Sequence, residues 1–430
     1  MAGISAPNNT ALSGESNEKH TFAFSMLTAL FFMIGFLTSL NDILIPHLKI
    51  VFDLNYFQAS LIQFMFFSAY FLMSLPSGKI IGKFGYQKGI VIGLLTSGTG
   101  AALFIPAAIL PSYPLFLIAL FTLASGFTIL QVAINPYVAI LGPSKTASSR
   151  LNLSQAFNSL GTTIAPWLGG ILILSAATIS MEALQSMSTE QLMEHKLLEA
   201  ASVKLPYLLL AGCLFLLALL FTVLKLPIVG DMEAEVKEEH TFAEVWKVTH
   251  LKWGVLGIFV YVGAEVSIGS YLVNFIGLPD IAGLMEKEAA TFVSYYWGGA
   301  MIGRFVGSAL MQKVDAGKLL GGFAGMAFLL TLTALFASGN FAMIAILSIG
   351  LFNSIMFPTI FTLAIHDLGA KTGKGSSLLI MAIVGGAILP VLMGIMADTI
   401  GLHTAFFLPA ICYVYIAWFG LKGSHVDDKI

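Results

Sequence analysis

The chain has 430 residues, of which 57% are hydrophobic and only 10% are charged, and its formal net charge is -2. Ordinary soluble domains carry about 25% charged residues, so this composition excludes a soluble globular protein and indicates an integral membrane protein. The small net charge and the lack of a dense basic tract give no reason to expect a nucleic-acid partner. Cys213 and Cys412 both fall in apolar runs, which argues against a disulfide scaffold and a cysteine metal site.

Residues 1–21 are expected to form a cytoplasmic tail, because they are polar and lack the apolar core of a signal peptide. Apolar runs long enough to cross about 30 Å of hydrocarbon then recur along the chain. The runs are continuous rather than alternating, which favours helices over the strands of a barrel. They predict twelve spans, at residues 22–46, 57–80, 88–108, 113–140, 150–173, 205–225, 251–276, 290–311, 318–337, 340–367, 375–396 and 402–421.

A charged segment, residues 226–250, separates the sixth and seventh spans. We interpret it as a cytoplasmic linker between an N-terminal six-helix bundle, residues 22–225, and a C-terminal six-helix bundle, residues 251–421, with a second cytoplasmic tail at 422–430. With both termini placed inside, 17 of the 21 Lys and Arg residues lie on the inner side, so the positive-inside rule predicts this orientation.

The two halves show weak self-similarity. Asn135-Pro136 in the fourth span corresponds to Phe357-Pro358 in the tenth, and a Gly-rich segment ending at Pro166 in the fifth corresponds to one ending at Pro390 in the eleventh. This pattern favours a duplicated transporter over a receptor or a membrane enzyme. No nucleophile elbow, phosphate loop or HExxH motif occurs, so we expect no catalytic residues and no cofactor beyond a coupling ion.

Two carboxylates lie inside predicted spans and away from their cytoplasmic ends, at positions where a charged residue costs about 2.5–3.5 kcal/mol on insertion scales. Asp42 follows Asn41 in "FLTSLNDILIP", and we interpret it as a titrating or cation-coordinating group. The alternative is that the first span ends before Asn41, which leaves Asp42 in the external interface. Glu265 is well centred in the seventh span. Its alternative is a helix–helix hydrogen bond made by a protonated carboxyl group.

Amide side chains gather on two neighbouring spans. Gln131 and Asn135 are spaced i, i+4 in the fourth span, and Asn152, Gln155 and Asn158 are spaced i, i+3, i+6 in the fifth. Each amide offers both a donor and an acceptor to ring hydroxyls without the cost of a buried charge. The amides therefore predict a polar cavity that binds a sugar; the alternative is interhelical hydrogen bonding, worth about 0.6 kcal/mol per bond in membranes.

Other candidates for substrate contacts lie on the remaining spans: Gln63, Asn274, Trp297 and Asn353. The aromatic face of Trp297 suits the C–H face of a sugar, although aromatic residues in membrane proteins also serve in interfacial belts and packing. The neighbouring Tyr295 and Tyr296 are weaker candidates. Arg304 lies near a cytoplasmic end, where its side chain can snorkel to water, and we interpret it as a gate or interface group rather than a substrate ligand.

Four blocks carry a resemblance to a known family: "NDILIPHL", "ASGFTILQVAINPYVAILG", "SRLNLSQAFNSLGT" and "FNSIMFPTIFTLAIHDLG". Over about residues 22 to 422 the chain strongly resembles the fucose-proton symporter family of the major facilitator superfamily, and within it the bacterial glucose/galactose transporters. The resemblance implies an all-α membrane protein of twelve helices in two pseudo-symmetric bundles. It also implies alternating-access import of a glucose- or galactose-type hexose by cation symport, in the bacterial cytoplasmic membrane. We expect a monomer in the lipid bilayer.

The coupling ion is the open question raised by this resemblance. The fucose branch uses one acid in the first span and another in the fourth; Asp42 matches the first, but Gln131 stands at the second and cannot titrate. A lone carboxylate beside amide oxygens suits a hard cation, so we predict Na+ bound by Asp42 with Gln131 and Asn41, and keep H+ as the alternative. Glu265 is expected to accept hydrogen bonds from sugar hydroxyls, with a second protonation site as the alternative role. Drug export by the same fold is disfavoured, because it predicts an apolar cavity with few amides.

Overall fold

The structure, a computed structural model, describes residues 9–52, 54, 56–109, 112–172, 188, 191, 204–227 and 240–426. Within these ranges the side chains of residues 9–18, 41–51, 56–57, 59–60, 166–172 and 286 lie outside the description.

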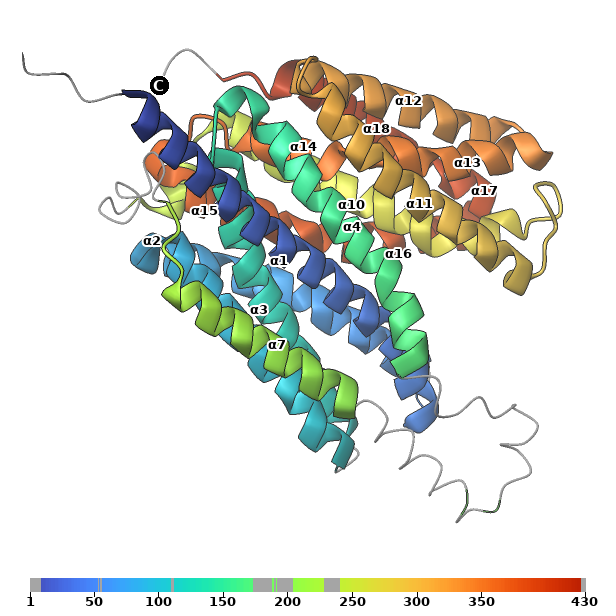
Figure 1. The fold of residues 1–430 in the computed structure, drawn as a ribbon. Helices are drawn as coiled ribbons and strands as arrows, with labels where there is room; N and C mark the ends of the chain where they lie inside the picture. The colour runs from blue at the N-terminus through green and yellow to red at the C-terminus, as the bar shows by residue number, and fades with distance from the viewer. Residues whose placement is uncertain are drawn as a thin grey trace, which may run out of the picture.

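The N-terminal half consists of long helices (Figure 1): α1 (Asn9–Val51), α2 (Tyr56–Ile109), α3 (Tyr113–Ile140), α4 (Ala147–Leu172) and α7 (Lys204–Val223). Helix α2 contains two spans, because its backbone leaves the helical region at Gly85, where φ is 80° and ψ is 170°. A positive φ of this kind favours glycine, since it has no Cβ to clash. The half therefore has the six spans expected from the sequence.

The C-terminal half also has six spans, which follow a short linker helix, α9 (Phe242–Val245). Three of its spans are single helices: α10 (Thr249–Ile276), α11 (Glu286–Leu310) and α12 (Ala316–Phe336). The other three are broken: α13 (Gly339–Asn353) with α14 (Met356–Ala364), α15 (Thr372–Met381) with η4 (Ala382–Val384) and α16 (Gly385–Ile400), and α17 (Leu402–Ala405) with α18 (Phe407–Trp418) and η5 (Phe419–Gly423). The predicted all-α architecture of two six-helix bundles is confirmed.

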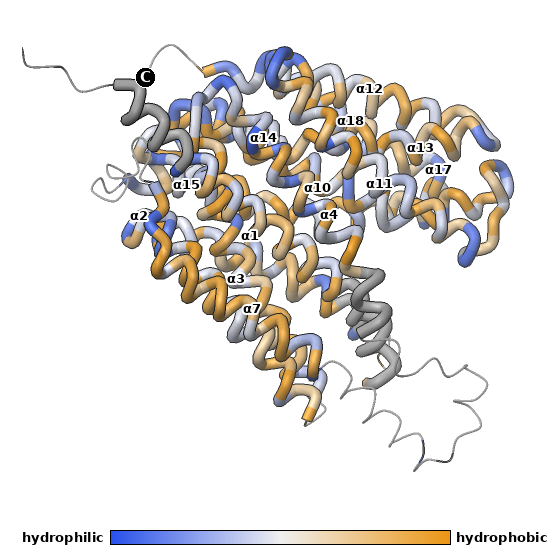
Figure 2. The backbone as a smooth tube through the Cα atoms, in the orientation of Figure 1, coloured by the Kyte–Doolittle hydropathy of each residue, from blue (hydrophilic) through white to orange (hydrophobic). Residues whose placement is uncertain are grey.

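Helix α7 shows how these helices meet the membrane. Its leucines Leu205, Leu216 and Leu219 are each at least 60% exposed, and Figure 2 shows the helix as almost uniformly hydrophobic along the outside of the bundle. An apolar surface of this kind marks a contact surface, and the length and composition of α7 suit contact with lipid. Among the described residues, nine helices or helix pairs are long and apolar enough to cross a membrane, with α2 counted once. The described parts of α4 and α11 fall outside this set, because both are more polar.

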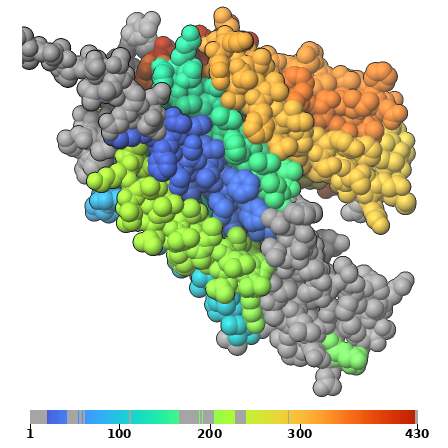
Figure 3. Space-filling view, viewed as in Figure 1, coloured from blue at the N-terminus to red at the C-terminus, as the bar shows by residue number. Residues whose placement is uncertain are grey.

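Glycines bring α1 and α4 into close contact. A Cβ at Gly35 would lie 2.1 Å from the carbonyl oxygen of Asn158, and one at Gly161 would lie 2.3 Å from the carbonyl oxygen of Phe32. Small residues at a helix interface allow this approach, which is a common way to pack helices in a membrane. Figure 3 shows α1 and α4 side by side on one face, with α11 beyond α4.

The two halves pack together at one end of the molecule, where α4 and α15 begin and where α11 and α14 end, and α4 stays in contact with α11 as far as Thr163 and Met301. On one side of this end α15 packs against α2 and α3, and the Ser376 hydroxyl donates to the carbonyl of Val132 over 2.9 Å. On the other side α4 bonds to α11 and α14. We call this second contact the α4 seam; it consists of Ser148 with Thr362 at 2.6 Å, Ser149 with Ser308 at 2.7 Å and Asn152 with Thr359 at 3.2 Å.

Candidate functional site

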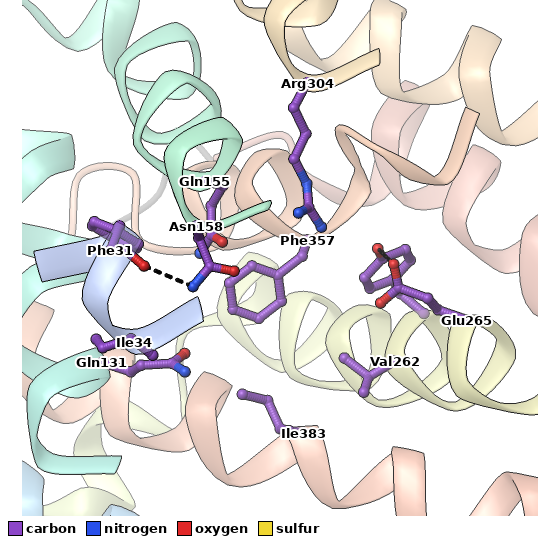
Figure 4. A pocket seen from close by; sticks show the side chains of 11 residues that line it. Phe31, Ile34, Gln131, Gln155, Asn158, Val262, Glu265, Arg304, Phe357 and Ile383 are labelled. Atoms are coloured by element: carbon purple, nitrogen blue, oxygen red, sulfur yellow. Dashed lines mark hydrogen bonds between the residues drawn. The ribbon is translucent and has the colours of Figure 1, made fainter. Parts of the chain in front are cut away.

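A cavity of about 150 Å³ lies between the two halves, above the α4 seam. It is smaller than the roughly 300–1,000 Å³ typical of pockets for drug-sized ligands, so its size suits a small solute. One wall comes from α1, α3 and α4, and the other from α10, α11, α14 and η4. The lining consists of Phe31, Ile34, Gln131, Gln155, Asn158, Tyr261, Val262, Glu265, Arg304, Phe357 and Ile383 (Figure 4).

The N-terminal wall is polar but carries only amides among its described polar groups. The Asn158 amide nitrogen donates to the carbonyl of Phe31 over 2.9 Å, which leaves the amide oxygen directed toward the cavity (Figure 4). The Gln131 amide nitrogen donates to the hydroxyl of the buried Tyr70 over 2.8 Å. These bonds fix which end of each amide faces the space between the halves. Gln155, one turn before Asn158 on α4, completes this wall.

The C-terminal wall carries the charged groups. Glu265 accepts a hydrogen bond from the hydroxyl of Tyr261 over 2.7 Å, one turn earlier on α10. The same hydroxyl lies 3.2 Å from the carbonyl oxygen of Asn353, so Tyr261 ties α10 to the end of α13. Because Tyr261 is buried and holds one carboxylate oxygen, Glu265 presents a fixed acceptor to the cavity. Tyr261 and Glu265 are four residues apart, a spacing that allows their side chains to bond on one helix face. The sequence analysis did not use this spacing to identify Tyr261.

Arg304 corrects part of the sequence analysis, which interpreted it as a gate or interface group near water rather than a substrate ligand. It does bond between the two halves, but it lies in the lining of the cavity and not at a cytoplasmic end. Its guanidinium points into the cavity (Figure 4), while Nε donates to the carbonyl of Ser354 over 3.2 Å and Nη1 donates to the hydroxyl of Ser159. The side chain is long, and it projects from α11 six residues before the helix ends at Leu310. That distance, about 9 Å along the axis, keeps the head group away from the end of the helix.

Several residues expected to bind substrate lie outside the lining. Asn135 is buried and donates to the backbone carbonyl of Gln131 over 2.8 Å. Asn353 is buried behind the C-terminal wall and donates to the Tyr296 hydroxyl over 2.8 Å. The other three are solvent- or lipid-facing: Gln63, Asn274 and Trp297. Asn135 and Asn353 therefore support the wall residues rather than the cavity surface.

Two further expectations have different outcomes. Asn152 belongs to the α4 seam, where its amide bonds to Thr359 and lies 3.2 Å from the sulfur of Met311. Asn41 and Asp42, the expected cation ligands, belong to the helical stretch of α1, but their side chains lie outside the described residues. Their role as cation ligands, and that of Gln131, stays a prediction.

The cavity combines neutral donors and acceptors with one carboxylate and one guanidinium, next to aromatic rings from Phe31 and Phe357. Amides, a carboxylate and a guanidinium together can pair with hydroxyl groups in either role, because hydroxyls both donate and accept. The rings can cover an apolar C–H surface. The arrangement suits a small solute that is rich in hydroxyl groups.

Comparisons with known proteins agree with this architecture. Residues 27–383 match the sequence profile of the Major Facilitator Superfamily. The chain is 54% identical over 423 residues to a glucose/galactose transporter of Brucella abortus, covering 98% of this chain and 99% of the relative. It is 38% identical to the L-fucose-proton symporter of Escherichia coli, covering 93% of this chain and 92% of the relative. A crystal structure of the transporter FucP in the outward conformation superposes with a TM-score of 0.88 at 36% identity, over 95% of this chain and 100% of that one.

Proposed function

Because this chain belongs to the major facilitator superfamily, a superfamily of transporters and not of enzymes, we propose that it imports glucose- or galactose-type hexoses by cation symport. The observation that carries the proposal is the cavity between the halves, with three amides on one wall and Glu265 and Arg304 on the other. The relative from Brucella abortus, named a glucose/galactose transporter, supports this class of substrate.

Alternating access is the proposed mechanism, with the two bundles rocking around the central cavity. The halves are joined at the end where α4 begins, by the α4 seam and by the contact of Ser376 with Val132. If that end is cytoplasmic, as the distribution of Lys and Arg predicts, the cavity belongs to the outward-facing state. The similarity to a transporter solved in the outward conformation supports the same assignment. We propose a monomer in the bacterial inner membrane.

Na+ is the proposed coupling ion. Position 42 belongs to α1, the helix that supplies Phe31 and Ile34 to the cavity wall. Its carboxylate, with Asn41 and the oxygen atoms of Gln131, would supply the oxygen ligands that a hard cation prefers. Gln131 is neutral at every pH, so it supplies no second proton site.

H+ is the second candidate. A relative at 38% identity is named an L-fucose-proton symporter, and Glu265 provides a second carboxyl group inside the cavity wall. A proton mechanism would then use Asp42 and Glu265 from opposite halves. This alternative differs from the Na+ mechanism in a measurable way, because it needs a pH gradient and no sodium.

Purified protein in liposomes tests the proposal. Labelled D-glucose and D-galactose should accumulate when an inward Na+ gradient is imposed at equal pH on both sides. Accumulation that persists without Na+ and collapses with the pH gradient would establish the proton alternative. Exchange of neither hexose under any gradient would overturn the proposed substrate class. An Asp42→Asn protein should still exchange sugar, but it should not accumulate it.

A further inference from the structure

Arg304 is the one described side chain that both lines the cavity and bonds across it to the opposite half of the molecule. Its Nη1 donates to the hydroxyl of Ser159 on α4, and its Nε donates to the carbonyl of Ser354 at the break between α13 and α14. Carbonyl groups at the end of a helix lack partners within the helix, and a cation there is favourable. The guanidinium therefore has an anchor in its own half and a second contact in the other half.

The backbone under Arg304 is fixed by glycines. A Cβ at Gly303 would lie 2.4 Å from the Ser354 hydroxyl, and one at Gly307 would lie 2.2 Å from Ile355. Helix α11 thus packs directly against the break between α13 and α14. Because this contact allows little sliding, the position of the guanidinium depends on its own side-chain torsions and on what its N–H groups meet.

The contact with Ser159 lies next to the α4 seam, on its cavity side, and continues the same row of contacts along α4. Ser148, Asn152 and Ser159 are spaced i, i+4, i+11 on α4, which places them on one face of the helix. The first two bond to α14, and the third bonds to Arg304. A guanidinium has five N–H donors and two are used here, which leaves three for a solute. Figure 4 shows the guanidinium pointing into the cavity.

We propose that Arg304 links occupancy of the cavity to the α4 seam, acting as a positioning residue that holds the seam closed until a solute competes for its donors. The proposal rests on the proposed function, since it needs a solute with hydroxyl groups in the cavity. A hydroxyl group that accepts from Arg304 while another donates to Glu265 draws the guanidinium toward α10 and away from Ser159. A ligand shifts a conformational equilibrium only through contacts that differ between the two states. In this proposal the contact of Arg304 with Ser159 is made when the seam is closed and broken when it is open.

The test removes the Ser159 contact and leaves the cavity lining intact. Spin labels at Lys145→Cys and Lys313→Cys, exposed positions on opposite halves beyond the α4 seam, report the separation of the halves in a background carrying Cys213→Ser and Cys412→Ala. Without sugar, Ser159→Ala should raise the ratio of open to closed seam by about three- to tenfold, as expected for loss of a hydrogen bond to a charged group. Ser159→Thr, which keeps the hydroxyl, should restore the wild-type ratio.

A matched control separates this effect from the loss of any buried hydroxyl on α4. Ser154 bonds to Thr28 over 3.0 Å within the N-terminal half, so Ser154→Ala should leave the ratio within about twofold of wild type. A Ser159→Ala distribution indistinguishable from that of Ser154→Ala would overturn the proposal.

The response to sugar distinguishes the Arg304 contact from the α4 seam itself. D-glucose should open the seam in the wild type and in Ser149→Ala, whose lost bonds to Ser308 lie away from the cavity. It should add little in Ser159→Ala, because the contact it would break is already gone; a full response there would refute the link. If D-glucose and D-galactose bind to none of the proteins, the substrate class is wrong, and the sugar-free comparison still decides the role of the Ser159 contact.

Discussion

The Tyr261 hydroxyl lies 2.7 Å from Oε1 of Glu265, one helical turn away on α10, and this bond fixes the carboxylate at the wall of the cavity. An acceptor that is already oriented loses little conformational entropy when a hydroxyl group binds to it. The second carboxylate oxygen remains for the solute. Tyr261 thus acts on binding through Glu265, although its own ring also contributes to the lining.

Replacing Tyr261 by Phe should weaken hexose binding by about three- to tenfold, because a hydrogen bond to a charged acceptor is lost while the buried ring is kept. Equilibrium binding of labelled D-glucose to the purified protein measures the effect. The melting temperature of Tyr261→Phe should fall less than that of a variant without an aromatic ring at position 261, because phenylalanine still fills the space of the ring.

Tyr271→Phe provides the control on the same helix. Its hydroxyl donates to the Pro390 carbonyl over 3.3 Å, outside the cavity lining. Hexose affinity should stay close to that of the wild type. Equal losses of affinity in the two variants would mean that the Tyr261 effect is a general loosening of α10 and not an effect on Glu265.

Glu265→Gln separates two roles for the carboxylate. If Glu265 accepts hydrogen bonds from sugar hydroxyls, affinity should fall by about tenfold, because a neutral amide is a weaker acceptor than a carboxylate, while counterflow exchange continues. If it is a coupling acid, accumulation should be lost with affinity little changed. Parallel measurements of D-glucose binding, counterflow and gradient-driven uptake on one preparation decide between the two.

The sequence was sufficient for the fold because membrane spans follow from a strong, local signal. Runs of about 20 apolar residues are needed wherever a helix crosses the bilayer. The spans predicted at residues 150–173 and 290–311, which correspond to α4 and α11, came from the same signal, although both helices are less apolar than the rest. The break at Gly85 inside α2 agrees with the boundary expected between the second and third spans.

The cavity surface was harder to predict, because it depends on the rotation of each helix about its axis. Tyr296 is buried against Asn353, whereas the adjacent Trp297 is 43% exposed, since neighbouring residues on a helix point about 100° apart. Apolar lining residues such as Phe31 and Phe357 carry no signal that separates them from packing residues. Arg304 was expected near water because its position in the sequence is close to a helix end. The sequence did not show that its side chain points into the cavity.

Close packing of α1 on α4 gives a prediction about stability. Gly35→Ala places a Cβ 2.1 Å from the carbonyl oxygen of Asn158, a backbone atom that cannot move alone. We expect a loss of roughly 1–3 kcal/mol in the free energy of unfolding, as for other overpacked interiors. Hexose affinity should fall as well, because Asn158 lines the cavity. Thermal unfolding in detergent and D-glucose binding are the two measurements.

Gly212→Ala on α7 is the matched substitution, because a Cβ there meets nothing within 4 Å. Alanine is the better helix former by about 1 kcal/mol, so this variant should be as stable as the wild type or more stable. A similar loss of stability in both variants would indicate that the α1–α4 contact is looser than the structure places it.

Gln131→Glu tests the coupling ion at the position where the resemblance to the fucose branch implies an acid. The Gln131 amide now donates to the Tyr70 hydroxyl over 2.8 Å. This hydroxyl can rotate and donate instead, so a glutamate should be accepted without loss of that bond. A carboxyl group in this wall titrates, unlike the amide, and its protonated form is the easier one to bury. We expect sugar uptake by the variant to rise as the external pH falls and to respond to an imposed pH gradient.

Gln155→Glu is the control for that substitution, because it adds the same charge to the same cavity at a different position. It should lower hexose affinity without making accumulation depend on the pH gradient. The wild type, measured in parallel at constant Na+, should show no gain from the pH gradient under the Na+ mechanism. If the wild type already responds as strongly as Gln131→Glu, the protons must use another carboxyl group, and Asp42 together with Glu265 would then be the pair to substitute.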